Sequence, residues 1–326
     1  MKKSIGLILL LSLLVNVVLL TKYNVVQKVV SRIIKLNKIN VLTISDLKKG
    51  NQMSVYFLNK LNVEKKKSPK DVNSNTSTPL SDNLFISPGF YSIKKNIYDF
   101  NKEGLYRIMS PGNGVFIHKI VFTEDLDALL SSLSWLTSHG NVDNKLTNKL
   151  LIKKLHNDKI YVTCGVITQL AVKILKEKGF KARFVMSMAK PSNWNSYNNG
   201  HSLIEVFNER YEKWVLYDLD NNFYFVNEKG LPLSLIEAIS NISNGNYKLI
   251  PLSNDIKVYD MKKFNLFSEV IVNNIDTWYK RCMLIQLIKH SNKIYFYNKE
   301  FKKDLLSYSS QFYFKDKDDF MDLFYR

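Results

Sequence analysis

The sequence predicts an α+β protein in which a helix packs on an antiparallel β-sheet, preceded by an N-terminal transmembrane helix. Three observations predict this arrangement. Residues 164–177 carry apolar side chains at helical spacing, residues 201–226 hold three short apolar segments separated by polar turns, and residues 4–20 form a run without a charge. With 326 residues, 45% of them hydrophobic, the chain can bury a sizeable core. Collagen-like, fully disordered and disulfide-scaffold classes are excluded.

The first element is a basic start followed by an apolar segment. Lys2 and Lys3 precede SIGLILLLSLLVNVVLL, residues 4–20, which is close to the roughly 20 residues that span a bilayer. The residues that follow lack the small side chains of a cleavage site, so we expect an uncleaved signal anchor over residues 1–22. The flanking lysines favour a cytoplasmic domain, whereas the short basic start favours export. We expect a single-pass, membrane-anchored protein whose folded domain is exported.

The positive charge is concentrated in the first 70 residues. They hold 14 of the 47 lysines and arginines but 2 of the 29 acids, so +12 of the net charge of +18 lies there and +6 in the rest. A basic excess spread over the whole chain would favour a nucleic-acid partner. This partition predicts attachment to a membrane and no nucleic-acid partner. An apolar stripe over residues 25–36, opposite lysines and an arginine, fits either a helix on the membrane surface or a continued anchor helix packed on the domain.

A polar stretch separates this region from the folded domain. Residues 64–79, EKKKSPKDVNSNTSTP, predict a linker, so residues 23–79 are interpreted as a basic juxtamembrane segment and linker. The folded domain is expected over residues 80–326, with its core at about 124–227 and a C-terminal extension beyond.

The first part of this domain combines strands and a helix. Residues 84–122 are rich in Phe, Tyr, Ile and Val, with turn signals at Pro88-Gly89 and Pro111-Gly112, and predict short strands. Residues 123–137 predict a helix, with Thr123 as its N-cap and a leucine stripe behind it.

The next helix carries the first candidate functional residue. Its apolar residues recur at i, i+1, i+4, i+5, i+8 and i+9, namely Val166, Ile167, Leu170, Ala171, Ile174 and Leu175. Thr163 is suited to the N-cap position and Gly179 to the C-terminal stop. Cys164 then lies in the first turn, where unpaired N–H groups and the helix dipole lower the pKa of a thiol.

Four short strands follow, at residues 180–185, 201–207, 214–219 and 223–226, the last three as an antiparallel meander. If Phe207 opposes Trp214 across the six-residue turn, His201 and Asp218 become diagonal neighbours on one face. A slip of one residue would separate them. Asp220, directly opposite His201 in this register, is the alternative partner.

Three local patterns together resemble the transglutaminase-like superfamily of papain-related thiol enzymes, over residues of about 124–227. Cys164 opens a helix that ends in LKEKGFKARFV, similar to the family's helix, glycine and Ala-Arg strand. His201 and Glu205 match its His-x-x-x-Glu strand in GHSLIEVF, and Trp214 and Asp218 match its Trp-x-x-x-Asp strand in WVLYD.

The chain also departs from that family. Leu219-Asp220 follow the aspartate where the family often has Pro-Thr, and Gly165 is less usual after the nucleophile. The first departure weakens the match of the loop more than the match of the three catalytic positions.

The resemblance implies a transglutaminase-like, papain-like fold and a Cys-His-Asp triad. Cys164 would be the nucleophile, His201 the general base, and Asp218 the group that orients the imidazole. The implied activity is acyl transfer or hydrolysis on peptide or amide bonds, by a cysteine protease, amidase or transglutaminase-type acyltransferase with a protein or peptide substrate and no cofactor. The alternative is a catalytically residual transglutaminase-like module for binding or assembly in the cell envelope.

The second cysteine, the remaining histidines and Trp135 are interpreted as structural residues without a chemical role. Cys282 lies in an apolar-periodic helix and is expected in the core. The remaining histidines show no metal-ligand spacing, so no metal is expected: His118, His139, His156 and His290. Trp135 is interpreted as a core residue, with a role beside the thiol as the alternative. The aromatic, lysine-rich C-terminal third is assigned no chemistry.

Overall fold

The computed structural model describes residues 77–94, 96–109, 116–194, 199–252 and 275–326, with two short strands at 54–57 and 64–65. The expected anchor helix at 1–22 and most of the basic segment at 23–79 lie outside the described residues. Within the described part of the chain, no helix is long and apolar enough to cross a membrane.

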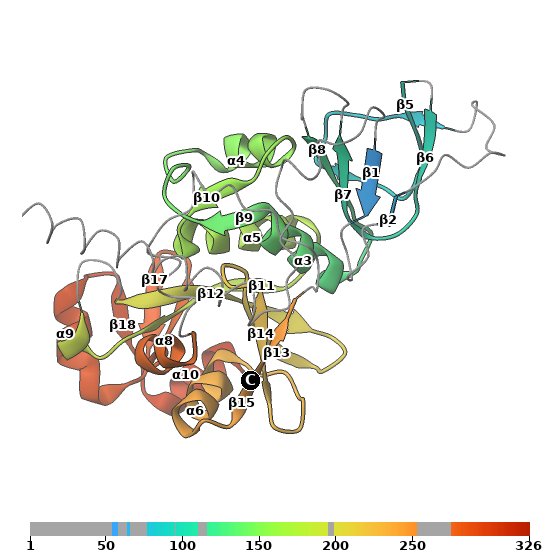
Figure 1. The fold of residues 1–326 in the computed structure, drawn as a ribbon. Coiled ribbons are helices and arrows are strands. Elements are labelled where there is room, and N and C mark those ends of the chain that lie inside the picture. The colour runs from blue at the N-terminus through green and yellow to red at the C-terminus, as the bar shows by residue number, and fades with distance from the viewer. Residues whose placement is uncertain are drawn as a thin grey trace, which may run out of the picture.

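An eight-stranded sheet is the centre of the molecule (Figure 1). Its strand order is β15-β14-β13-β12-β11-β16-β17-β18, and all neighbours are antiparallel except β17 and β18. The strands are β11 (Ala182–Met188), β12 (Gly200–Asn208), β13 (Lys213–Asp218), β14 (Phe223–Asn227), β15 (Tyr247–Pro251), β16 (Ile285–His290), β17 (Lys293–Phe296) and β18 (Phe312–Phe314).

The predicted meander of β12, β13 and β14 is confirmed, and so is its register. Phe207 pairs with Trp214, and Ile204 pairs with Tyr217. The strand predicted at residues 180–185 begins two residues later, because Phe180 still caps the preceding helix through its N–H to the Leu175 carbonyl.

Helices cover both faces of this sheet. Helix α5 (Cys164–Glu177) packs on β11 and β12 and shares one apolar core with them. A second core lies on the other face and joins β11, β12 and β13 to three helices (Figure 1). These are α6 (Leu235–Asn244), α8 (Ile275–Cys282) and α10 (Lys317–Phe324). The expected arrangement of a helix on an antiparallel sheet is therefore present, and the fully buried Cys282 lies in the second core, as predicted.

The ends of two helices test the predicted caps. Thr163 precedes α5 in extended conformation, as expected for an N-cap, although its side chain makes no cap hydrogen bond. Gly179 follows α5 with a φ of 88°, a conformation that favours glycine. Helix α3 (Leu126–Leu136) begins later than predicted, and its N-cap is Asp125 and not Thr123. The Asp125 carboxylate accepts hydrogen bonds from two first-turn N–H groups, which stabilises the later start.

Two smaller sheets hold the strands predicted between residues 84 and 122. One has the order β2-β1-β7-β8-β4 and the other the order β3-β5-β6. Strands β1 and β3 lie before Leu80, the expected start of the folded domain, and pair with β7 and β5 respectively. The strands are β1 (Ser54–Phe57), β2 (Glu64–Lys65), β3 (Thr78–Pro79), β4 (Phe85–Ile86), β5 (Gly89–Ile93), β6 (Asn96–Phe100), β7 (Gly104–Met109) and β8 (Phe116–Val121).

A parallel pair of short strands leads into α5. Strand β9 (Thr137–His139) follows α3 directly, and β10 (Ile160–Val162) ends two residues before Cys164. Helix α4 (Asn148–Leu155) connects them. Trp135, at the end of α3, is 1% exposed and packs against the His118 ring, which agrees with its interpretation as a core residue.

A buried ion pair ties the C-terminus to the sheet. Glu205 is fully buried and accepts hydrogen bonds from Arg183 Nε and Nη2 at 2.8 and 2.7 Å. It also accepts the N–H of Leu235 at 2.7 Å and the hydroxyl of Tyr325 at 3.1 Å. Arg183 in turn donates to the carbonyl of Phe324. Glu205 and Arg183, which both belong to the motifs that resemble the transglutaminase-like superfamily, therefore hold α6 and α10 against the sheet.

Replacing Glu205 by alanine is expected to lower the free energy of unfolding by about 3–5 kcal/mol, because it leaves the Arg183 guanidinium buried without its counter-charge. Chemical denaturation measures this change. Glu209→Ala is the matched control, since the Glu209 side chain is 78% exposed and its ion pair with Lys181 spans 3.8 Å. Equal denaturation midpoints for the two variants would contradict a stabilising role for the buried pair.

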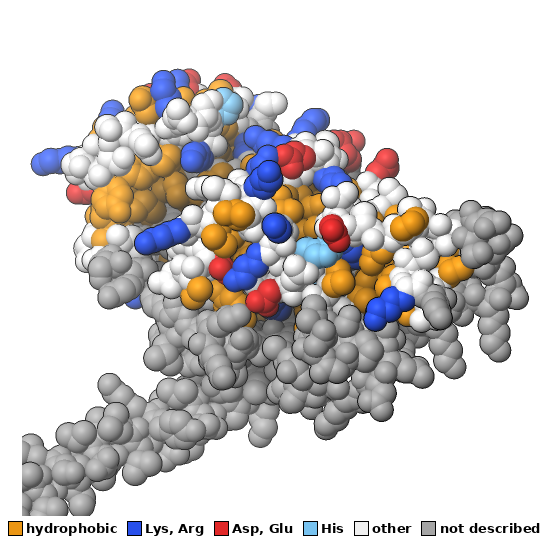
Figure 2. All heavy atoms as spheres, turned by 90° about the horizontal axis from the view of Figure 1, so that it is seen from above, with side chains coloured by type: hydrophobic (Ala, Val, Ile, Leu, Met, Phe, Trp, Pro, Cys, Tyr) orange, Lys and Arg blue, Asp and Glu red, His pale blue; other side chains and the backbone are white. Residues whose placement is uncertain are grey.

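The surface in Figure 2 is mixed in character. Lysine and arginine side chains on the described part of this face are interspersed with acidic, polar and hydrophobic ones (Figure 2). The face therefore lacks a continuous basic surface over its described residues.

Candidate active site

Cys164 lies at the N-terminus of α5, as predicted. The thiol is hydrogen-bonded to His201 and receives the backbone N–H of Ser202. Burial alone would raise the pKa of the thiol, and Asp220 also raises it, but the hydrogen bond and charge of His201 and the Ser202 N–H hold the pKa below its ordinary value. The side chain thus sits in surroundings that favour the thiolate, the form in which sulfur is a nucleophile.

His201 is the second residue of β12 and is 4% exposed. Its Nε2 is hydrogen-bonded to Asp218 Oδ2 at 2.8 Å, which leaves Nδ1 as the nitrogen for the thiol. The ring also meets the Trp278 ring edge-on at 4.6 Å. Burial lowers the pKa of the imidazole, but Asp218 and Cys164 outweigh it and raise that pKa well above its ordinary value. An imidazolium is therefore favoured beside the thiolate.

Asp218 is fully buried, and both of its oxygens have partners. Besides His201, Oδ2 accepts hydrogen bonds from the Tyr279 hydroxyl at 2.5 Å and from Asn221 Nδ2 at 2.9 Å. Oδ1 accepts the backbone N–H of Asn221 at 3.0 Å. Burial raises the pKa of the carboxyl, whereas His201 and these donors lower it, and the net shift is downward. Asp218 therefore stays ionised and fixes the imidazole orientation.

The hairpin register explains how these two residues meet. Asp218 and His201 lie on the same face of β12 and β13 as Leu203 and Leu216, which pack toward α6, α8 and α10. The α8 residues Trp278 and Tyr279 reach the imidazole and the carboxylate from this side. The structure thus brings Cys164, His201 and Asp218 together, the three residues expected from sequence.

A second histidine–aspartate pair adjoins the thiol and was not foreseen. Asp220 does not replace Asp218 as the partner of His201; its Oδ2 is hydrogen-bonded to His139 Nδ1 at 2.6 Å. Burial lowers the pKa of His139, but Asp220 and Cys164 outweigh it, so the net shift is upward. His139, which received a structural interpretation from sequence, therefore adjoins the candidate site through Asp220.

Asp220, the thiol of Cys164 and the His201 ring form one cluster. One donor atom from each of Cys164, His201 and Asp220 lies within 4.8 Å of the other two. These are the donor types that bind a transition metal, and they form the one such group found among the described residues. The expected hairpin register places Asp220 opposite His201, but His139, which bonds Asp220, comes from β9, a strand that reaches the site through its parallel pairing with β10.

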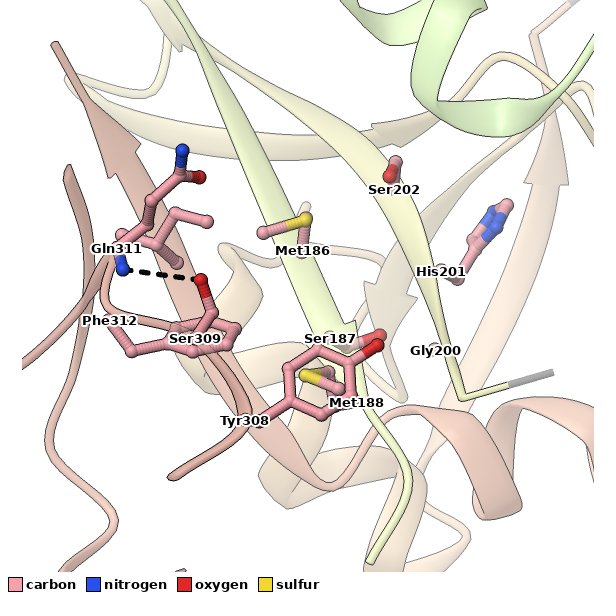
Figure 3. A pocket seen from close by; sticks show the side chains of 11 residues that line it. Met186, Ser187, Met188, Gly200, His201, Ser202, Tyr308, Ser309, Gln311 and Phe312 are labelled. Carbon is pink, nitrogen blue, oxygen red and sulfur yellow. Dashed lines mark hydrogen bonds between the residues drawn. The ribbon is translucent and has the colours of Figure 1, made fainter. Parts of the chain in front are cut away.

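A cavity of about 310 Å³ lies beside the site, between β11, β12 and the segment from Tyr308 to Phe312. Figure 3 shows Met186 and Met188 on β11, with Ser202 and Gly200 on the neighbouring strand and Tyr308 opposite. The His201 ring is directed away from these methionines (Figure 3). Gly200 is required here, because a Cβ at this position would lie 2.1 Å from the carbonyl oxygen of Ser187.

Comparisons with known proteins add no identification: no family model, no curated protein and no solved structure matches the chain. The resemblance to the transglutaminase-like superfamily, and the papain-like fold that it implies, stay predictions. What stands on the structure alone is a mixed α/β protein with a Cys-His-Asp group in which the histidine and Asp218 are buried and the cysteine is half-buried.

Proposed function

We propose that this protein is a membrane-anchored cysteine enzyme that performs acyl transfer or hydrolysis on peptide or amide bonds through Cys164, His201 and Asp218. The observation that carries the proposal is the continuous hydrogen-bonded series from the thiol through His201 to the buried carboxylate of Asp218. A nucleophile, a base within hydrogen-bond reach and a third group that orients the base are the parts that covalent catalysis by a thiol requires.

The first chemical step forms a thioester. The Cys164 thiolate attacks the carbonyl carbon, the C–N bond breaks, and His201 gives its proton to the leaving amine. The first-turn N–H groups of α5 are suited to stabilise the negative charge that develops on the carbonyl oxygen, and the Ser202 N–H, which bonds the thiol, lies beside them. In the second step, water or an amine attacks the thioester, His201 takes the proton of the attacking group, and the thiolate is restored.

The cavity beside β12 supports a peptide substrate. Its walls combine the flexible thioethers of Met186 and Met188 with the rings of Tyr308 and Phe312, and it borders Ser202, whose N–H bonds the thiol, while the His201 ring is directed away from it. A volume of about 310 Å³ is enough for one side chain of a bound peptide. Protein or peptide substrates therefore remain the proposed class, with no cofactor in the acyl-transfer steps.

The membrane attachment in this proposal rests on the sequence of residues 1–22, with an exported catalytic domain. The charge-free run at residues 4–20 and its basic flanks support a single-pass anchor. A reporter fused to the C-terminus, active only on one side of the membrane, distinguishes export from a cytoplasmic domain.

Alkylation of the full-length protein by iodoacetamide at neutral pH tests the proposed nucleophile. We expect rapid modification of Cys164 and none of Cys282. The Cys282 thiol is buried, and burial is the main cause that raises its pKa well above the ordinary value. His201→Gln should slow modification of Cys164 by about 10-fold or more, since it removes the partner of the thiolate. Intact mass and peptide mapping measure both rates.

His290→Gln is the matched control, because His290 is exposed on β16. If Cys164 reacts at the same rate in the His201 and His290 variants, the thiol is not activated by His201 and the proposed enzyme is excluded. A protein that binds or assembles with an inert triad is then the remaining interpretation.

A further inference from the structure

The cluster of Cys164, His201 and Asp220 has the composition of a zinc site. Zn²⁺ binds thiolate sulfur, imidazole nitrogen and carboxylate oxygen, commonly with three protein ligands and an open fourth position. In a tetrahedral site these donors lie about 3.5 Å apart. Here the donor atoms are within 4.8 Å of one another, so side-chain rotations that shorten the longest separation by about 1.3 Å would complete the geometry.

Two of the three proposed ligands, His201 and Asp220, are each hydrogen-bonded to a second residue. His201 uses Nε2 for Asp218, and this leaves Nδ1 to face the cluster. Asp220 uses Oδ2 for His139. Metal-binding histidines and carboxylates are usually oriented in this way by hydrogen bonds to a second group. Hydrogen bonds to a second residue therefore orient His201 and Asp220 toward the cluster without a metal, and small side-chain rotations bring the donors to bonding distance.

An oxygen atom at the cluster lacks a partner. The side chain of Asp220 is 6% exposed, and its Oδ1 is buried without a hydrogen bond to any described residue. A buried carboxylate oxygen of this kind costs free energy unless a donor or a cation satisfies it. In a zinc complex, thiolate and carboxylate ligands from Cys164 and Asp220 would supply two negative charges to the divalent cation.

We propose that Cys164, His201 and Asp220 bind Zn²⁺, with a water molecule as the fourth ligand and His139 as the residue that positions Asp220. Binding releases the proton that the thiol and the imidazole share, and the sulfur lone pair that would attack a carbonyl is donated to the metal. Bound Zn²⁺ therefore blocks the reactivity of Cys164 reversibly. The metal site itself does not depend on the proposed acyl transfer; only its inhibitory consequence rests on that function.

Zn²⁺ uptake by the metal-free, full-length protein tests the site. Competition with a chromophoric chelator should give one Zn²⁺ per chain. Asp220→Asn and Cys164→Ser should each weaken binding at least 10-fold, and His139→Gln about 10- to 100-fold. Asp319→Asn, which changes an exposed acid on α10, should leave binding unchanged. With Co²⁺ as the probe, a sulfur-to-cobalt charge-transfer band should appear, disappear in Cys164→Ser and persist in Cys282→Ala.

The same samples separate this proposal from the acyl-transfer function. Zn²⁺ should protect Cys164 from iodoacetamide, and a chelator should restore its modification. Absence of stoichiometric Zn²⁺, or equal affinity in wild type and Asp220→Asn, overturns the metal site while leaving alkylation of the metal-free thiol intact. Conversely, a metal-free Cys164 that fails to react overturns the acyl-transfer function but not a measured Zn²⁺ site.

Discussion

Replacing Cys164 by alanine is expected to reduce cleavage of peptide amides by about 10⁴-fold or more, to the background rate, because it removes the thiol that forms the acyl intermediate. A pool of short peptides capped with a fluorogenic amide, incubated with the full-length protein, measures the rate. The folded state should be retained, because the substitution removes one sulfur atom at a helix end without inserting new volume.

Cys282→Ala is the matched control for this experiment. It removes the second thiol of the chain, which is free, fully buried and part of the core formed with α6 and α10. Turnover should persist in this variant. Loss of turnover in Cys282→Ala together with its retention in Cys164→Ala would reject the assignment of the nucleophile.

The second large effect is expected from Asp218→Asn, which should lower kcat by about 10³- to 10⁴-fold. The neutral amide removes the charge that stabilises the imidazolium, and its NH₂ group can turn toward Nε2 and favour the wrong tautomer. Substrate affinity should change little, because Asp218 is fully buried. Steady-state kinetics on the same fluorogenic peptides separates kcat from KM.

Tyr279→Phe provides the comparison for Asp218→Asn. It removes one of the donors to Asp218 Oδ2 but keeps the carboxylate charge and the ring that packs against Phe225. We expect a loss of about 10-fold, the value of one hydrogen bond of roughly 1–1.5 kcal/mol. If Asp218→Asn costs no more than Tyr279→Phe, the carboxylate has only a packing role.

Local patterns were sufficient for the strands and the helix that carry the three proposed catalytic residues. The period of apolar side chains set the extent of α5, and the six-residue turn set the register that brings His201 diagonal to Asp218. Both depend on residues close together in sequence. The cap of α3 was less predictable, because Thr123 and Asp125 are both suitable caps and only the hydrogen bonds of Asp125 distinguish them.

Contacts between distant segments were not predictable in the same way. Tyr279 and Trp278 reach the site because α8 packs across the sheet about a third of the chain away from the thiol, and no periodicity encodes that packing. His139 arrives through parallel pairing of β9 with β10, across an intervening helix. The proposed metal ligand Asp220 was visible in the sequence only as a second choice for His201.

The place of β16 in the central sheet has a consequence for the order in which the site is built. Val185 on β11 pairs with Ile288 on β16. One edge of β11 therefore lacks its neighbouring strand until residue 288 has left the ribosome. Tyr279, a donor to Asp218, is also made after Cys164 and His201. Asp218 follows Cys164 after 54 residues, whereas Tyr279 follows it after 115. The nascent chain therefore holds all three proposed catalytic residues before the hydroxyl that hydrogen-bonds Asp218 exists, and the surroundings of the carboxylate are completed late in translation.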